Sequence, residues 1–263
     1  MIPKEQLTDI FFDLDHTLWD FEKNSALTFD FIFKELNLSI DFKDFLNHYN
    51  PINHYYWKLY RENKISQEEL RFNRLVKTFE TLKFDIAHPQ INQIAALYIE
   101  KLSTFTHVFE GAHELLQNLS KDYRYTSSPM VLSPYSITNV FEGAHELLQN
   151  LSKDYRLHII TNGFESVQHY KLANSGLQPY FEFTFTAEKV GFKKPHHKIF
   201  ETAIQATQAR VEHSLMVGDS LEADIEGALQ CGMHAVHFNS HNESEHDKCP
   251  IVYSLNELNQ MFN

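Results

Sequence analysis

The feature that most constrains the fold is an alternation of short apolar runs with amphipathic helical patterns. The runs occupy residues 10–14, 157–161, 181–186, 215–217 and 235–238. Continuous apolar runs of this length are typical of parallel strands that are buried on both faces. Between them, apolar residues recur at helical spacing, which would place one apolar face of each helix on a sheet. The alternation therefore predicts a doubly wound, parallel α/β sheet.

The segment after the first run, residues 21–106, breaks this alternation. It contains long aromatic and charged helical stretches and no comparable strand. We interpret it as an inserted helical cap domain, and residues 1–20 and 107–263 as the α/β core. The insertion follows the end of the first strand, where α/β proteins bind their ligands, so a lid is the favoured role. A helical bundle that only stabilises the sheet is the alternative.

One stretch of the chain is duplicated. Residues 108–124 (VFEGAHELLQNLSKDYR) recur unchanged at residues 140–156, with a period of 32. Two copies are too few for a solenoid, so recent copying in the gene or an error in the recorded sequence is the better explanation. The second copy leads directly into the run at 157–161. We expect it to fill the helix slot before that strand, with residues 108–139 as a duplicated insert, because connections are normally short. Loop-closure entropy grows slowly with length, so an exchange between the copies stays open.

Composition limits the class of protein and its partners. A chain of 263 residues that is 43% apolar is long enough for a globular core. Its formal charge of −12 would repel nucleic-acid polymers and anionic membranes. The two cysteines suggest no disulfide framework, and the chain lacks both an apolar signal core and a run of roughly 18 apolar residues. We expect a cytoplasmic monomer or weak homodimer that takes a small ligand.

The strongest local motif is Asp13-Leu14-Asp15-His16-Thr17 at the end of the first apolar run. Two carboxylates one residue apart in an extended chain point the same way. Crowded carboxylates repel each other, and a divalent cation with oxygen ligands relieves that repulsion. A simple turn or helix N-cap would need only Asp15 or Thr17. Taken alone, the motif therefore fits a structural turn or cap as well as a metal site.

The other predicted strands also end in polar or charged residues. Chance would scatter such residues over both edges of the sheet, whereas here they follow the strands at what should be one edge. This coincidence favours a functional site over a structural role. The residues are Thr161, Asn162 and Gly163, then Lys194, and then Asp219 and Asp224.

These four segments resemble the four motifs of the haloacid dehalogenase superfamily, in order, over essentially the whole chain apart from the duplicated insert. The resemblance implies a phosphatase in which Asp13 attacks phosphorus and becomes transiently phosphorylated. Asp15 would protonate the departing ester oxygen and later deprotonate the hydrolytic water. Thr17 would help to orient Asp15 and belongs to the predicted substrate-binding residues.

The same resemblance implies a Mg²⁺ cofactor and a phosphate cradle. Asp13, the backbone carbonyl of Asp15 and Asp219 would bind the metal, with Asp224 acting through water or through the surrounding hydrogen bonds. Lys194 would balance charge on the nucleophile and on the transferring group. Thr161, with Asn162 and Gly163 and their backbone N–H groups, would hold the phosphate oxygens.

Within this superfamily, the chain resembles a narrower group, the bacterial pyrimidine 5'-nucleotidases with a helical cap. The segments that carry this resemblance are FFDLDHTLWDF, IITNGF, VGFKKP and MVGDSLEADIEGA. This resemblance implies nucleoside monophosphates as substrates. Because the four strand ends recognise only the phosphate group, a sugar-phosphate phosphatase or a phosphomutase stays an alternative. True dehalogenases lack the second aspartate, so Asp15 favours phosphoester chemistry. Of the cap aromatics we expect at most two to contact substrate; they are Trp19, Phe21, Tyr49, Tyr55, Tyr56, Trp57 and Tyr60.

Several signals are discounted or left open. His196 stands where relatives often carry Asp, which puts the following helix cap in doubt, and Lys193 is interpreted as a solvated neighbour of Lys194. Residues 234–249 hold four histidines and a cysteine whose spacing matches no zinc pattern, so surface histidines are the favoured interpretation. His16 is not assigned a role. A catalytically impaired interaction protein, disturbed by the duplication, is the alternative from another class.

Overall fold

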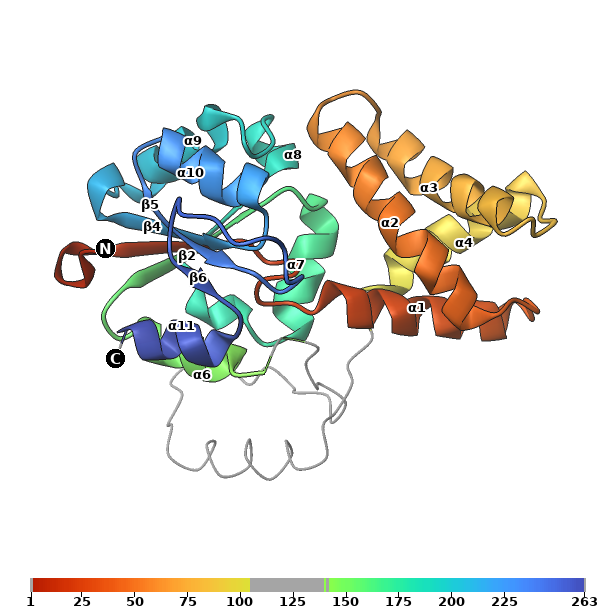
Figure 1. The fold of residues 1–263 in the computed structure, drawn as a ribbon, viewed down its shortest axis with the longest axis horizontal. Helices are drawn as coiled ribbons and strands as arrows, with labels where there is room; N and C mark the ends of the chain where they lie inside the picture. The colour runs from red at the N-terminus through yellow and green to blue at the C-terminus, as the bar shows by residue number, and fades with distance from the viewer. Residues whose placement is uncertain (1, 105–139, 141, 263) are drawn as a thin grey trace, which may run out of the picture.

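The structure is a computed structural model that describes residues 2–104, 140 and 142–262 (Figure 1). Its centre is a six-stranded parallel sheet with the order β3-β2-β1-β4-β5-β6. The strands are β1 (Asp9–Phe12), β2 (Arg156–Thr161), β3 (Phe183–Thr186), β4 (Ser214–Gly218), β5 (His234–Phe238) and β6 (Ile251–Val252). This is the order of a doubly wound sheet, so the predicted fold class is confirmed.

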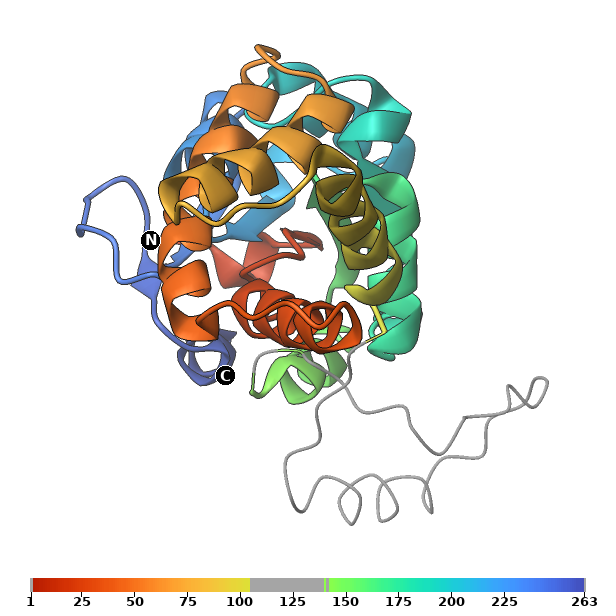
Figure 2. The same cartoon turned by 90° about the vertical axis from the view of Figure 1, so that its right-hand side faces the viewer.

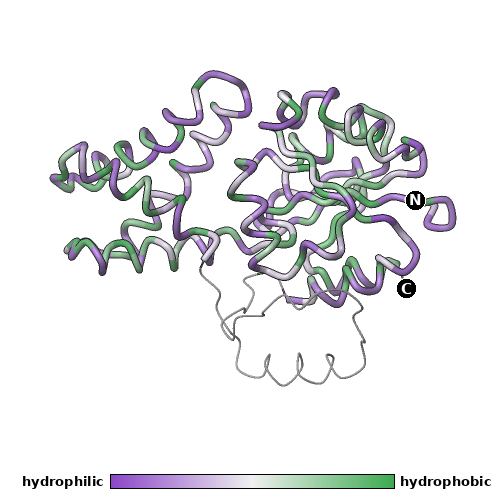
Figure 3. Tube along the Cα trace, turned by 180° about the vertical axis from the view of Figure 1, so that it is seen from behind, coloured by the Kyte–Doolittle hydropathy of each residue, from purple (hydrophilic) through white to green (hydrophobic). Residues whose placement is uncertain are grey.

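The central strand β1 pairs with β2 on one side and with β4 on the other, so its end lies in the middle of the sheet edge. Its four residues are buried, as are all five residues of β4. At the start of β1, the buried carboxylate of Asp9 accepts from Arg156 and His158 of β2, at 2.7 and 3.0 Å. Figure 3 shows hydrophobic residues concentrated along these strands. The five strands that the apolar runs predicted are all present.

Helices cover both faces of the sheet (Figure 1). On one face, Phe11 and Met216 pack against α9 (His197–Thr207) and α10 (Gly227–Gln230). On the other face, the apolar side chains of β1, β2 and β4 pack with α6 (Ala144–Leu151), α7 (Glu165–Asn174) and α11 (Leu255–Phe262). A short helix, α8 (Ala187–Val190), follows β3. Strand β6 is only two residues long, too short for its apolar pattern to be recognised in the sequence.

Four further helices lie together beyond one edge of the sheet. They are α1 (Phe21–Glu35), α2 (Phe42–Arg61), α3 (Gln67–Thr81) and α4 (His88–Lys101). Figure 2 looks from this side and shows the four helices in front of the strand ends. Phe29 lies at their centre, in contact with the rings of Phe45, Tyr49 and Tyr98. Asp20, Asp41 and Ser66 cap the first three helices through their side chains, which fixes where each begins. The domain boundaries themselves stay a prediction.

The second copy of the repeat forms α6, and its last residue begins β2. Ala144, Leu147, Leu148 and Leu151 are buried against the sheet and α11. Glycine 143 precedes the helix with a φ of +82°, a conformation that favours glycine. The expected occupant of the slot is therefore confirmed, and the first copy, residues 108–124, lies outside the described residues.

Across the described ranges, no helix combines the length and the apolar character needed to span a bilayer.

The identical copies supply an internal control for the packing of α6. We expect Leu148→Ala to lower the free energy of unfolding by about 2–5 kcal/mol, because it opens a cavity where a fully buried side chain packs. The equivalent change in the other copy, Leu116→Ala, leaves this slot filled and should have little effect. Urea unfolding of both variants measures the difference. Equal losses would show that the two copies share the slot.

Candidate active site

The candidate site lies at the point where the strand order reverses, between β1 and β4. In doubly wound sheets this switch point, outside the carboxyl ends of the strands, is where ligands bind. Asp13 directly follows β1, and Asp219 directly follows β4. The backbone N–H of Asp13 donates to the carbonyl of Val217 at 2.8 Å, which extends the pairing of the two strands as far as Asp13.

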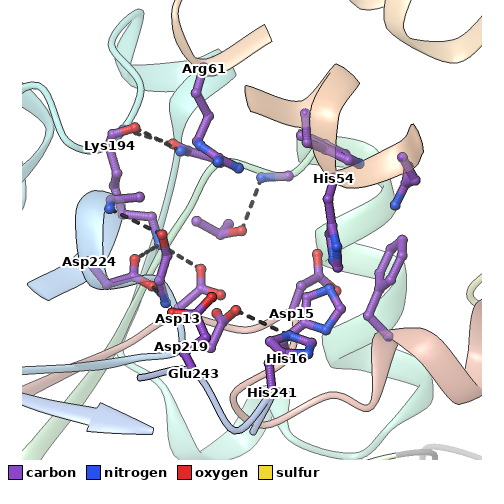
Figure 4. A pocket seen from close by; sticks show the side chains of 18 residues that line it. Asp13, Asp15, His16, His54, Arg61, Lys194, Asp219, Asp224, His241 and Glu243 are labelled. Atoms are coloured by element: carbon purple, nitrogen blue, oxygen red, sulfur yellow. Dashed lines mark hydrogen bonds and ion pairs between the residues drawn. The ribbon is translucent and has the colours of Figure 1, made fainter. Parts of the chain in front are cut away.

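A cavity of about 510 Å³ opens over this point, a volume ordinary for a small-molecule site (Figure 4). Its floor comes from the loops after β1, β2, β4 and β5 and from Lys194, and one wall comes from α2. Eight of the nine predicted site residues line it, and the ninth, Thr17, is buried beside them. The sequence motifs therefore meet in one place. The eight are Asp13, Asp15, Thr161, Asn162, Gly163, Lys194, Asp219 and Asp224.

Lys194 is buried in the floor of the cavity, and its ammonium group makes three polar contacts. It donates to Asp13 Oδ1 at 2.6 Å and to the carbonyl of Ile160 at 2.7 Å, and it forms an ion pair with Asp224 Oδ1 at 2.6 Å. The contact with Asp224 is an ion pair only, because Asp224 Oδ1 has no hydrogen-bond donor among the described residues. Lys194 thereby fixes the carboxylate of Asp13 against the end of β2.

Asp224 reaches the cluster from a π-helical turn, Leu221–Glu226. Its Oδ2 accepts from the backbone N–H of Ser220 at 3.0 Å, while Oδ1 faces Lys194. Gly218, at the end of β4, makes this approach feasible: a Cβ at that position would lie 2.4 Å from the carboxylate of Asp224. Such π-turns occur often at functional sites.

The three carboxylates of Asp13, Asp219 and Asp224 carry more negative charge than the ammonium group of Lys194 balances. Burial, with the charges of Asp224 and Asp15, raises the pKa of Asp13 to about 7, although Lys194 acts in the opposite direction. Burial and the carboxylates of Asp13 and Asp224 raise the pKa of Asp219 well above its usual value. Burial alone would lower the pKa of Lys194, but Asp13 and Asp224 outweigh it and raise it. A further cation would relieve the repulsion between these carboxylates.

The donor set fits a hard dication. Asp13, Asp219 and Asp224 each offer a carboxylate oxygen, and these oxygens lie within 4.8 Å of one another. Oxygen ligands of this kind are those that Mg²⁺ and Ca²⁺ bind. Because Asp224 is also paired with Lys194 and Ser220, Asp13 and Asp219 are the more available ligands.

Asp15 is held by two residues of α7 that the sequence analysis did not single out. The ammonium group of Lys171 forms an ion pair with Asp15 Oδ1, and the amide of Gln168 donates to Asp15 Oδ2 at 2.9 Å. Lys171 is buried and lies over the ring of Trp19, at 4.1 Å from its centroid. Burial lowers the pKa of Lys171, and the charge and hydrogen bond of Asp15 oppose that shift. The Asp15 carboxylate is thus fixed at both of its oxygens.

The segment after β2 braces the floor of the cavity. Asn162 forms a pair of hydrogen bonds with the backbone of Lys194, accepting from its N–H at 2.8 Å and donating to its carbonyl at 2.9 Å. The hydroxyl of Thr161 accepts from the N–H of Gly163 at 3.1 Å. Gly163 also gives room to Gln168, whose amide nitrogen would lie 2.0 Å from a Cβ there. Asn162 therefore positions Lys194, a role that the sequence did not indicate.

Three local expectations differ from the structure. The hydroxyl of Thr17 points at Asp219 Oδ1, 3.5 Å away, whereas Lys171 and Gln168 hold Asp15. Lys193 is not merely solvated: its ammonium group donates to the carbonyl of Tyr60 at 2.8 Å and to Asn63 at 2.7 Å, which ties it to the end of α2. His196 does cap α9, because its ring accepts from the N–H of Lys198 at 3.2 Å.

Two of the four tail histidines, His237 and His241, are not simple surface residues. His237 is fully buried in β5, and its Nε2 lies 2.8 Å from the backbone carbonyl of Asp219 while its Nδ1 lies 3.0 Å from His246. His241 lines the cavity, with its Nε2 3.7 Å from Asp219 Oδ2. His237 reaches Asp219 because β5 pairs with β4, and His241 reaches it because the chain after β5 returns beside Asp219. No local sequence pattern encodes that return.

The wall of the cavity is one face of α2. Asn53, His54, Trp57 and Arg61 line it, at spacings that place them along one side of a helix. Asn53 Oδ1 accepts from the guanidinium of Arg74 at 2.6 Å. Since a guanidinium can only donate, this contact fixes which atom of the Asn53 amide is oxygen and leaves its NH₂ group as a donor for a ligand. Of the cap aromatics, Phe21 and Trp57 line the cavity.

With this geometry in place, the known proteins that resemble the chain can be considered. A family model for haloacid dehalogenase-like hydrolases matches residues 10–232. The chain belongs to this hydrolase family.

Two relatives resemble the chain over nearly its whole length. Pyrimidine 5'-nucleotidase PynA of Streptococcus pneumoniae is 30% identical, with 94% of this chain and 90% of PynA aligned. Pyrimidine 5'-nucleotidase YjjG of Escherichia coli is 27% identical, with 96% of each chain aligned. The crystal structure of the putative HAD-hydrolase YfnB from Bacillus subtilis, bound to magnesium, superposes with a TM-score of 0.77 at 24% identity, covering 97% and 98% of the two chains. The haloacid dehalogenase-like fold is thus confirmed.

The stability of this haloacid dehalogenase-like chain should report on its metal site independently of turnover. At neutral pH and with chelator present, we expect Asp219→Asn to raise the free energy of unfolding by about 1 kcal/mol or more. The reason is that burial and like charges raise the pKa of Asp219, so its ionisation opposes folding. Mg²⁺ at a hundredfold excess over its Kd should stabilise the parent by about 2.7 kcal/mol, and the variant by much less.

Urea unfolding with and without Mg²⁺ measures both effects, and Glu222→Gln is the matched control because Glu222 is exposed on the same turn. Equal stabilisation of parent and Asp219→Asn by Mg²⁺ would contradict the assignment of Asp219 as a metal ligand.

Proposed function

We propose that this chain is a Mg²⁺-dependent phosphomonoester hydrolase that acts through an aspartyl phosphate on Asp13, with pyrimidine nucleoside 5'-monophosphates as substrates. The observation that carries the proposal is the arrangement at the floor of the cavity. There, Asp13 is fixed by Lys194 next to Asp219 and Asp224, and Asp15 is fixed at both oxygens on the same floor. A nucleophile, an acid–base group and a metal-binding set thus face one cavity.

The two steps follow from the two aspartates of the first loop. In the first, a carboxylate oxygen of Asp13 attacks phosphorus, the bond from phosphorus to the ester oxygen breaks, and Asp15 gives that oxygen a proton. In the second, Asp15 takes a proton from water as the water oxygen attacks phosphorus. The bond to Asp13 then breaks, so inorganic phosphate leaves, Asp13 returns to its carboxylate form and Asp15 regains the proton that it gave in the first step.

Lys171 and Gln168 give Asp15 a fixed direction for these transfers. Both bond to its carboxylate from α7, so rotation of that side chain is restricted. Positioning within a fraction of an ångström matters for proton transfer to a leaving group. We assign Lys171 and Gln168 as positioning residues and Asp15 as the acid–base group.

The negative charge of the phosphoryl group that is transferred to Asp13 has to be balanced by cations close to Asp13. Lys194 supplies one as a point charge held at three contacts. Mg²⁺, held by Asp13 and Asp219 with Asp224 behind them, would neutralise the phosphoryl oxygens and bring the anionic substrate to an acidic floor. The hydroxyl of Thr161 and the backbone N–H groups of Asn162 and Gly163 lie at the same edge, where we assign them to the phosphate oxygens.

The leaving group is assigned to the face of α2. Asn53 offers an amide donor, and Arg61 extends into the cavity (Figure 4). Trp57, whose ring stacks with that of Phe164, also lines the cavity. A pyrimidine base has carbonyl oxygens that accept such hydrogen bonds and a ring that packs on an aromatic side chain. The relatives named pyrimidine 5'-nucleotidase align over at least 94% of this chain, so the likeness includes this helix.

A phosphate-release panel tests the proposed substrate. The purified chain with Mg²⁺ is assayed on cytidine, uridine and thymidine 5'-monophosphates, on adenosine and guanosine 5'-monophosphates, and on ribose 5-phosphate. We expect kcat/KM for the pyrimidine nucleotides to exceed kcat/KM for the purine nucleotides and ribose 5-phosphate by at least about tenfold. A tenfold ratio corresponds to about 1.4 kcal/mol, which a single well-placed interaction can supply.

Two controls separate the parts of this proposal. Asp13→Asn and excess chelator should each abolish release, while Asp30→Asn, a matched change on the exposed side of α1, should not alter it. A preference for ribose 5-phosphate would contradict the nucleotide assignment and favour a sugar-phosphate phosphatase. Absence of turnover on every ester by a folded protein would instead favour an impaired interaction protein.

A further inference from the structure

Three histidines gather at one side of the cavity although they are far apart in the sequence. They are His16, His54 and His241, and one ring nitrogen from each lies within 4.8 Å of the other two. Figure 4 shows the three rings together beside Asp15. Their ring centroids are 4.7 to 6.0 Å apart. Nothing in the proposed hydrolysis uses this cluster.

Each histidine is supplied by a different element. His16 lies in the loop after β1 with a φ of +64°, a conformation uncommon for a residue other than glycine. His54 comes from α2, and His241 comes from the loop after β5. The cluster therefore links α2 to two loops of the sheet edge, and the position of α2 determines whether the three nitrogens are close.

The geometry is near that of a three-histidine metal site. Around a tetrahedral ion with metal–nitrogen distances of about 2.0–2.1 Å, the ligand nitrogens lie roughly 3.4 Å apart. Since the three nitrogens lie within 4.8 Å of one another, no pair would have to approach by more than about 1.4 Å, which side-chain rotation or a small movement of α2 can supply. Three imidazoles with one open position are a donor set that zinc and neighbouring transition metals bind.

Carboxylates surround the cluster and favour a cation over an anion. Glu22 lies 3.8 Å from His241 Nδ1, and Asp219 lies 3.7 Å from His241 Nε2. In metal sites, a carboxylate commonly accepts from the ring nitrogen that does not bind the metal. Among the described residues, five carboxylates and two cationic side chains line the cavity, so an anion would meet net repulsion at the histidines, which are not among the proposed Mg²⁺ ligands. The seven are Asp13, Asp15, Asp219, Asp224 and Glu243, with Arg61 and Lys194.

We propose that His16, His54 and His241 form a second metal site, selective for a borderline transition-metal dication such as Zn²⁺, and that its occupation ties α2 to the sheet edge beside the cavity. The site is distinct from the carboxylate set of Asp13, Asp219 and Asp224, because imidazole nitrogen favours Zn²⁺ whereas carboxylate oxygen favours Mg²⁺. It goes beyond the hydrolysis proposed above and does not depend on the identity of the substrate.

Calorimetric titration with Zn²⁺ tests the site directly. The full chain, without an affinity tag, is saturated with Mg²⁺ so that the carboxylates are occupied, and Zn²⁺ is then added. We expect one tight Zn²⁺ per chain, and we expect His54→Ala and His241→Asn each to weaken it by at least about tenfold. His54 is exposed on α2, so its variant should fold, which circular dichroism checks.

Matched controls use other histidines. His48→Ala removes an exposed imidazole from the same helix, and His246→Gln removes the partner of His237; both should leave Zn²⁺ affinity unchanged. Affinity that survives His54→Ala but disappears in Asp219→Asn would place the ion among the carboxylates and overturn the proposal. Unchanged affinity in both His54→Ala and His241→Asn would overturn it as well.

Hydrogen exchange tests the link to α2. Because His54 is the only ligand of the proposed set from that helix, Zn²⁺ should slow exchange of the amides around residue 54 by at least about threefold in the parent and leave it unchanged in His54→Ala. Tight binding without any change in exchange on α2 would contradict the linkage. These measurements need no substrate, so their failure is distinguishable from failure of the proposed hydrolysis.

Discussion

The buried ammonium group of Lys194 is the interaction on which the rest of the site depends. It joins Asp13 after β1, the carbonyl of Ile160 in β2 and Asp224 from the turn after β4. Carboxylates buried together at a sheet edge oppose folding unless cations compensate them. One lysine cannot compensate three carboxylates, and a dication bound among them would relieve the remaining repulsion. The same buried charges would then account both for a cost in folding and for metal binding.

Much of this site follows from the sequence because parallel strands bring their carboxyl ends to one edge. The apolar runs predicted the strands, and the polar residues after them, such as Asp13, Thr161 and Asp219, then had to meet. Contacts that helices make with the site were harder to predict from the sequence. Gln168 and Lys171 read as ordinary residues of an amphipathic helix, and only the placement of α7 brings them to Asp15. Likewise, His54 and His241 depend on where α2 and a long loop lie, which no local spacing records.

The helices after β1 join the wall of the cavity to its floor. α2 presents Asn53, Trp57 and Arg61 to the cavity, and Lys193, next to Lys194 in the chain, bonds to the end of that helix. A movement of α2 would therefore reach the leaving-group wall and the neighbour of the central lysine together. The duplicated segment precedes the sheet strand β2, and its second copy supplies α6 on the opposite side of the sheet from α9 and α10.

The central claim is that phosphorus becomes bonded to Asp13, and it can be observed by trapping that bond. In Asp15→Asn with 4-nitrophenyl phosphate, the phenolate leaves without needing a proton, whereas the second step lacks its base, so the intermediate should accumulate. Acid quenching followed by peptide mass spectrometry should then find a phosphoryl group on Asp13. Release of 4-nitrophenolate with Asp13 unmodified, or with the phosphoryl group on another residue, would contradict the account.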